Sequence, residues 1–171
     1  MQKANVCYLV RKRDGHTEVC LVEKKRRYGK GLLVGYGGKI EWYDYHSFHS
    51  VIREIGEESG VVVQQADLRR IAILSSYSLC ESARWSVDVF TCDKWIGNLQ
   101  ETEECGPPEW HRIDQLPLRR MFPDAASWLP HALYSTKLEH ISVFYGHDGT
   151  ELQAVFIAGL YDQRTSKSRL Y

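Results

Sequence analysis

The sequence predicts an α+β fold with a mixed β-sheet, and three observations carry this prediction. Short runs of β-branched, aromatic and other apolar residues follow one another with turn signals between them. Only two segments show helical character, and they do not alternate with the strands as repeated βα units would. The 171 residues are enough for one hydrophobic core and too few for two full domains.

The N-terminal strands are expected to form a β-hairpin. Apolar residues fill much of positions 6–10 and 19–22, and Asp14 and Gly15 supply a turn between them. Four further strands are expected at 32–34, 71–74, 87–92 and 110–113. These runs are too short to be helices, and together they would supply most of one sheet.

The first predicted helix has apolar residues at i, i+3, i+4 and i+7, the spacing of one helix face. These residues are Phe48, Val51, Ile52 and Ile55. Ser47 is available as the N-cap, and Gly60 as the C-terminal stop. The helix is therefore expected between these two residues.

A second helical segment spans 125–134. Pro130 lies inside it, and proline lacks a backbone N–H and clashes with the preceding turn. We therefore expect an interruption rather than a continuous helix. Asp124 is placed to cap a short first part.

The C-terminal part of the chain predicts a second hairpin. Segments 141–145 and 152–158 flank turn residues at 146–149. The last residues are polar and carry no apolar pattern. We expect one domain over residues 1–160, followed by a flexible tail over 161–171.

The charge balance restricts the partners. The chain carries 22 Lys plus Arg and 22 Asp plus Glu, so its formal net charge is zero. A nucleic acid polymer or an anionic membrane surface would favour a basic protein, so neither is expected as a partner. No apolar run approaches the roughly 18 residues of a membrane span.

The cysteine pattern and the N-terminus indicate a compartment. The five cysteines lack the CxxC spacing of a zinc or redox motif, which indicates reduced thiols. The first apolar run, at 6–10, is too short for a signal sequence. We expect a cytoplasmic location, with the nuclear or mitochondrial pool as alternatives.

The densest acidic cluster lies at the end of the first predicted helix. Glu54, Glu57 and Glu58 fall within an arc of about 100° beside the apolar stripe. Like charges at these spacings repel one another, so a compensating cation is expected. Three carboxylates on one face suit Mg²⁺ or Mn²⁺, with substrate phosphates in the remaining positions. The alternative is an ordinary solvated face on which Arg53 pairs with Glu57.

A glycine-rich loop precedes this helix. Residues 35–39 read Gly-Tyr-Gly-Gly-Lys and follow a predicted strand. Glycines let the backbone approach a ligand closely, so a carbonyl or amide of this loop can address a metal ion or a phosphate. Lys24 and Lys39 add positive charge suited to phosphates.

Loop and helix together resemble the signature of the Nudix hydrolase family, G-x5-E-x7-R-E-U-x-E-E-x-G-U with U apolar. The chain supplies Gly38 and the complete second half, at 53–61. The first half differs, because Asp44 stands where the first glutamate belongs and eight residues separate it from Arg53. The resemblance implies the Nudix fold, a mixed sheet between helices, and hydrolysis of a nucleoside diphosphate linked to another group.

The resemblance also implies roles for site residues. It implies that Mg²⁺, or Mn²⁺, is held mainly by three helix glutamates and a loop carbonyl, those of Glu54, Glu57, Glu58 and Gly37. Arg53 is implied to orient the glutamates through a salt bridge, which completes the expected catalytic set. Glu104 is the expected substitute for a further metal-site glutamate of the family, whose aligned position holds Cys105.

A longer similarity covers about residues 6–157. The stretches 24–31 and 110–124 resemble the mammalian branch of the family, which hydrolyses oxidised purine nucleoside triphosphates such as 8-oxo-dGTP. This resemblance implies cleavage to the monophosphate and pyrophosphate. The expected partner is a small nucleotide, and the expected state is a monomer.

The same branch implies a substrate pocket made of phosphate-binding and base-framing residues. These are Lys24, Tyr28, Val34, Gly37, Gly38, Lys39, Phe122, Asp124 and Trp128. Val34 and Ala125 stand where the branch has an asparagine and a second aspartate, so the base is less well defined than the reaction. Core packing of the aromatic residues and helix capping by Asp124 are the alternative interpretations.

Two other functions stay open. One is a Nudix hydrolase of another nucleotide, such as an unmodified or methylated dNTP, a dinucleoside polyphosphate or ADP-ribose, which the departures at Val34 and Ala125 favour. The other is a non-catalytic nucleotide-binding module. The altered first half of the signature favours it, and the complete set of glutamates argues against it.

Overall fold

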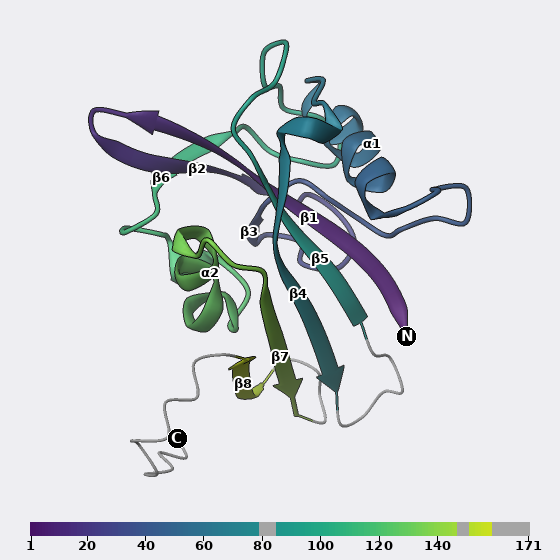
Figure 1. Cartoon of the computed structure of the whole chain (residues 1–171), viewed down its shortest axis with the longest axis vertical. Helices are drawn as coiled ribbons and strands as arrows, with labels where there is room; N and C mark the ends of the chain where they lie inside the picture. The colour runs from purple at the N-terminus through teal and green to yellow at the C-terminus, as the bar shows by residue number, and fades with distance from the viewer. Residues whose placement is uncertain (79–84, 147–150, 159–171) are drawn as a thin grey trace.

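The computed structural model describes residues 1–78, 85–146 and 151–158 (Figure 1). The strands are β1 (Gln2–Arg13), β2 (His16–Glu23), β3 (Leu33–Val34), β4 (Leu68–Ser78), β5 (Trp85–Cys92), β6 (Glu109–Arg112), β7 (Glu139–Tyr145) and β8 (Leu152–Ala158). The helices are α1 (Ser47–Ser59) and α2 (Ala125–Tyr134), with short 3-10 turns at Gln65–Asp67 and Leu118–Arg120.

The strands form one mixed sheet in the order β3-β2-β1-β5-β4-β7-β8, and β6 pairs with Glu18–Leu21 of β2. β1 pairs parallel to β5 and β4 pairs parallel to β7, whereas the other pairs are antiparallel. Both predicted hairpins are confirmed, as β1–β2 and β7–β8. Residues 147–149 of the second turn and the expected tail, 161–171, lie outside the described residues.

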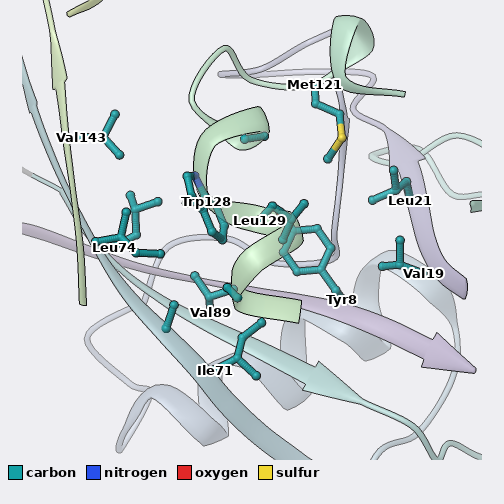
Figure 2. Packing of buried hydrophobic residues seen from close by; sticks show 14 of the residues in the cluster. Tyr8, Val19, Leu21, Ile71, Leu74, Val89, Met121, Trp128, Leu129 and Val143 are labelled. Carbon is teal, nitrogen blue, oxygen red and sulfur yellow. The ribbon is translucent and has the colours of Figure 1, made fainter. Parts of the chain in front are cut away.

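The two helices cover opposite faces of the sheet, as the alternation along β1 shows. Cys7 and Leu9 belong to a core cluster with Val51 and Ile55 of α1. Tyr8, between them, belongs to the second cluster, with Trp128 and Leu129 of α2 (Figure 2). The α+β architecture with a sheet between helices is therefore confirmed.

Helix α1 begins one residue differently from the prediction. Its N-cap is His46, whose Nδ1 accepts a hydrogen bond from the backbone N–H of His49 at 3.1 Å. Ser47 is therefore the first helical residue, and its assignment as the cap was wrong because an imidazole nitrogen serves as the acceptor. Gly60 ends the helix as predicted, in a left-handed conformation with φ 75°.

Helix α2 is continuous through Pro130, so the predicted interruption was wrong. An interior proline costs about 3 kcal/mol. Burying one large apolar side chain contributes about 1.5–3 kcal/mol, and α2 buries both Trp128 and Leu129. Packing against the sheet therefore outweighs the local cost. Asp124 stands at the N-cap position, but its side chain makes no capping hydrogen bond.

The cysteines that the structure describes behave as small apolar residues. Cys7, Cys20, Cys92 and Cys105 are buried and form no disulfide. Burial raises the pKa of the Cys20 thiol to about 11, so this thiol stays protonated near neutral pH. Over the same part of the chain, neither helix is long and apolar enough to cross a bilayer.

Candidate active site

The glycine-rich loop is fixed against strand β1. The N–H of Asn5 donates to the Gly38 carbonyl at 2.9 Å, and Cys7 exchanges backbone hydrogen bonds with Tyr36. A Cβ atom on Gly37 would lie 2.3 Å from the Asn5 carbonyl oxygen. Only glycine fits there, so the absence of a side chain allows the loop to follow the strand closely.

Glu58 of α1 is buried beneath this loop, with 2% of its surface exposed. Its Oε2 accepts a hydrogen bond from the Gly37 N–H at 2.8 Å, and its Oε1 lies 3.8 Å from Lys24 Nζ. Burial raises the pKa of Glu58 to about 7, although Lys24 and the Gly37 N–H favour the charged form. A solvated helix face therefore does not describe this residue.

Glu54 is packed against Gly38, where an added Cβ would lie 2.7 Å from its carboxylate. Burial raises the pKa of Glu54 as well. Arg53 lies 2.9 Å from the carboxylates of both Glu54 and Glu57. Glu57 is the exposed member of the three, with 60% of its side chain accessible, and here the predicted i, i+4 pair with Arg53 does form.

Asp44 holds Arg53 from the other side. Its fully buried carboxylate accepts from the guanidinium at 2.9 and 3.2 Å, and the N–H of Glu41 donates to it at 2.9 Å. These bonds keep the pKa of Asp44 well below its usual range. Asp44, which replaces the first glutamate of the signature, therefore anchors Arg53 in place.

The glutamates line a polar cavity of about 210 Å³, here called the acidic cavity. Its lining residues are Arg27, Glu41, Tyr43, Arg53, Glu54, Glu57, Glu58 and Glu104. Oxygen ligands of this kind suit Mg²⁺ or Mn²⁺, and a cation would compensate the buried charge of Glu58. Among the described residues, no group of acidic, histidine or cysteine side chains is already arranged as a metal site. In this cavity Arg53 pairs with two of the glutamates, Glu54 and Glu57.

Glu104 and Cys105 take different positions. Glu104 lines the acidic cavity and pairs with Arg26 at 2.6 Å. Cys105 is fully buried, and burial raises the pKa of its thiol to about 12. A protonated thiol is a poor ligand for a hard cation, so the structure favours Glu104 of the two.

A second cavity, of about 320 Å³, lies on the α2 side of the sheet and is here called the base cavity. This volume is within the range of small-molecule sites, roughly 300–1,000 Å³. All the predicted substrate-binding residues line it, namely Lys24, Tyr28, Val34, Gly37, Gly38, Lys39, Phe122, Asp124 and Trp128. The structure thus brings together residues from separate stretches of the sequence.

The aromatic residues of the base cavity differ in exposure. Tyr28 is 76% exposed and stacks on Phe122 with ring centroids 5.3 Å apart, so it is not a core residue. Trp128 is 4% exposed and belongs to the core cluster while also lining the cavity. Lys39 Nζ lies 5.3 Å from the ring centre of Trp85, which lines the same cavity.

Asp124 is the buried carboxylate of the base cavity. Its Oδ2 accepts from Trp128 Nε1 at 2.6 Å, and its Oδ1 accepts from the hydroxyl of Tyr145 on β7. The two donors, on α2 and β7, hold this side chain in one orientation. The sequence analysis missed Tyr145, although the alternation of Ile141, Val143 and Tyr145 places all three on the core face of β7.

The sequence analysis also missed Arg27. It lines both the acidic cavity and the base cavity, so the two are adjacent. No periodicity of the sequence marks this position. The structure does mark it, because Arg27 has a positive φ, which is uncommon for a residue other than glycine.

Fold and site together define a class: an α+β domain in which a glycine-rich loop and an acidic helix lie beside a pocket of small-molecule size. The chain belongs to the Nudix family, because the NUDIX domain profile matches residues 1–132. It is 32% identical over 130 residues to the oxidized purine nucleoside triphosphate hydrolase of Danio rerio, covering 76% of this chain and 81% of that protein.

Two further similarities agree with this assignment. The enzyme of the same name from Mus musculus is 32% identical over 129 residues, which cover 75% of this chain and 76% of that protein. The mutator MutT protein from Bacillus halodurans superposes with a TM-score of 0.75 at 25% identity, over 92% of this chain and 98% of the other. The protein is therefore a Nudix hydrolase.

Proposed function

We propose that this protein hydrolyses oxidised purine nucleoside triphosphates, such as 8-oxo-dGTP, to the monophosphate and pyrophosphate in a metal-dependent reaction. The observation that carries the proposal is the contact of the two cavities: the carboxylates of α1 line one, and the predicted base-framing residues line the other. The names of the fish and mouse relatives support the same substrate class.

In this proposal the phosphate end is organised by the loop and α1. Glu54, Glu57 and Glu58 would hold Mg²⁺ or Mn²⁺, with Glu104 and the Gly37 carbonyl as further ligands. The metal, when bound, neutralises phosphate charge and lowers the pKa of a bound water. Ion pairs from Arg53 set the positions of Glu54 and Glu57 before substrate arrives.

The cationic side chains of the base cavity complete the phosphate end. Lys24 and Lys39 line it beside the glycine loop, where they favour the negative charge of a phosphate chain. Lys24 Nζ also donates to the Gly37 carbonyl at 3.4 Å and lies near Glu58, so it connects the loop with the acidic helix.

The base end combines stacking with one polar contact. Phe122 and Tyr28 offer aromatic faces at the cavity, and Trp128 forms part of its wall. Asp124 offers a carboxylate that its two donors keep oriented. A base that presents N–H donors on one edge is the expected partner, because both carboxyl oxygens of Asp124 act as acceptors in these contacts.

A second candidate is hydrolysis of a different nucleotide, such as a methylated or unmodified dNTP. Val34 and Ala125 both line the base cavity, and neither side chain can form a hydrogen bond. The double variant Val34→Asn, Ala125→Asp tests this candidate. If it turned over 8-oxo-dGTP far better than the unmodified protein did, the natural substrate would be another nucleotide.

A panel assay tests the proposed function directly. The protein is incubated with 8-oxo-dGTP, 2-oxo-dATP, the four normal dNTPs, ADP-ribose and a dinucleoside polyphosphate, each with Mg²⁺ and with EDTA, and pyrophosphate and nucleotide products are quantified. We expect the highest kcat/KM for an oxidised purine and no turnover in EDTA. Tight binding without turnover of any nucleotide would instead identify a non-catalytic module.

A further inference from the structure

Arg27 occupies the junction of the two cavities. It is the residue common to the linings of the acidic cavity and the base cavity. A nucleotide whose base lies in one and whose phosphates reach the glutamates of the other would pass this side chain. Its position alone makes it a candidate contact for the connecting phosphates.

The backbone of Arg27 is in the left-handed region, with φ 62°. Gly29 and Gly31, in the same loop, have φ 84° and 85°, values that glycine adopts without steric cost. The loop is closed by hydrogen bonds, among them Lys30 N–H to the Arg27 carbonyl at 3.2 Å. A residue with a Cβ is strained in this conformation, and a glycine here would avoid that strain.

The guanidinium of Arg27 also differs from neighbouring cations. Lys25 pairs with Glu101 and Arg26 pairs with Glu104, both at 2.6 Å. Arg53, across the acidic cavity, is held by Asp44. Arg27 forms no ion pair with any residue in the described ranges, so its charge is not already compensated there.

On the basis of the proposed nucleotide hydrolysis, we infer that Arg27 binds the phosphate chain of the substrate where it crosses from the base cavity to the acidic cavity. Its planar fork of donors matches two phosphate oxygens, which a lysine cannot do. The residue would thereby favour nucleotides that carry a polyphosphate chain. The strained backbone is the cost of placing the guanidinium at this junction.

The experiment compares binding and stability in variants of Arg27. Arg27→Gly relieves the backbone conformation and removes the charge, and Arg27→Asn removes the charge with a residue that tolerates positive φ. Binding is measured by calorimetry with inorganic tripolyphosphate in Mg²⁺, and stability by thermal unfolding. We expect both variants to bind about 10- to 100-fold more weakly. Arg27→Gly should have an equal or higher Tm.

Asp14→Gly is the matched control. Asp14 has φ 49° in the turn between β1 and β2, and its side chain is 88% exposed. The change should relieve a similar conformation without altering tripolyphosphate binding. Unchanged binding in Arg27→Gly and Arg27→Asn would overturn the inference. An unmodified protein that turned over no nucleotide would refute the proposed function, while the binding comparison would still test Arg27.

Discussion

The acidic cavity and the base cavity are adjacent at Arg27, but they are built in different ways. Most of the acidic cavity comes from one stretch of sequence, 41–58. The base cavity is assembled from β1, β3, β4, β5, β7, α2 and neighbouring loops. One site is therefore specified locally, and the other depends on the whole fold.

The internal contacts of the two cavities show the same difference. Around the acidic cavity, Arg53 pairs with Asp44, nine residues away, and with its helix neighbours Glu54 and Glu57. In the base cavity, Asp124 at the start of α2 is held by Trp128 of the same helix and by Tyr145, 21 residues further on in strand β7. A side chain on the α2 side of the base cavity, such as Tyr145, can therefore change without disturbing the glutamates, whereas Lys24, which lines the same cavity, lies 3.8 Å from Glu58.

The largest effect is expected at the helix glutamates. Glu57→Gln and Glu58→Gln should each lower kcat by about two to three orders of magnitude, because in the proposed reaction each would remove a charged oxygen ligand of the metal. Burial already raises the pKa of Glu58, so a neutral glutamine is easier to bury, and its Tm in EDTA should not fall. Circular dichroism controls for folding. Full activity in both variants would show that these glutamates of α1 take no part in the reaction.

The next effect is expected at Asp44. Asp44→Asn weakens the charged contact with Arg53, so kcat should fall by about tenfold. The free energy of unfolding at pH 7 should fall by about 1–3 kcal/mol. Arg53 lowers the pKa of Asp44, so this stabilisation is present above the unfolded pKa, near 3.9, and lost as pH falls through the folded value.

Urea unfolding at pH 7, 5 and 3 measures the Asp44 effect. The difference in free energy of unfolding between the unmodified protein and Asp44→Asn should have its full size at pH 7 and pH 5 and be smaller at pH 3. A difference that grew on acidification would show that the low pKa of this carboxyl has another origin. Asp114→Asn is the control, since Asp114 pairs with Arg112 at the surface, away from both cavities.

Much of the fold could be predicted from periodicity. The stripe of Val51 and Ile55 and the stop at Gly60 predicted α1, and the runs around Asp14 and Gly15 predicted the first hairpin. The errors were local. A histidine took the capping role given to Ser47, and tertiary packing kept α2 continuous, which no local rule could predict.

The parts of the site that lie close together in sequence could be predicted, and the parts that depend on the three-dimensional fold could not. The spacing of the three helix glutamates is visible in sequence, but the role of Asp44 depends on a loop path that spacing does not define. The contact of Tyr145 with Asp124 depends on where β7 lies in the sheet relative to α2. The position of Arg27 between two cavities depends on the same three-dimensional arrangement.

A smaller effect is expected at Tyr145. Tyr145→Phe keeps the ring and removes the hydroxyl that donates to Asp124, so the carboxylate loses one of its two orienting bonds. KM for the preferred nucleotide should rise by about tenfold, with kcat within about twofold, because the phosphate end is unchanged. Tyr134→Phe, at the exposed C-terminal end of α2, should leave both constants unchanged. An unchanged KM in Tyr145→Phe would mean that Trp128 alone orients the carboxylate.

The smallest effect is expected at the mouth of the base cavity. Tyr28 stacks on Phe122 at an interplanar angle of 22°, and an aromatic pair of this kind contributes about 0.5–1.5 kcal/mol. Tyr28→Leu should therefore raise KM about threefold to tenfold, with little change in Tm because the ring is mostly exposed. Tyr45→Leu, at a tyrosine that is 90% exposed and lines neither cavity, is the control. If Tyr28→Leu lowered kcat and left KM unchanged, the ring would act on the phosphate end. The division of roles between the two cavities would then not hold for this residue.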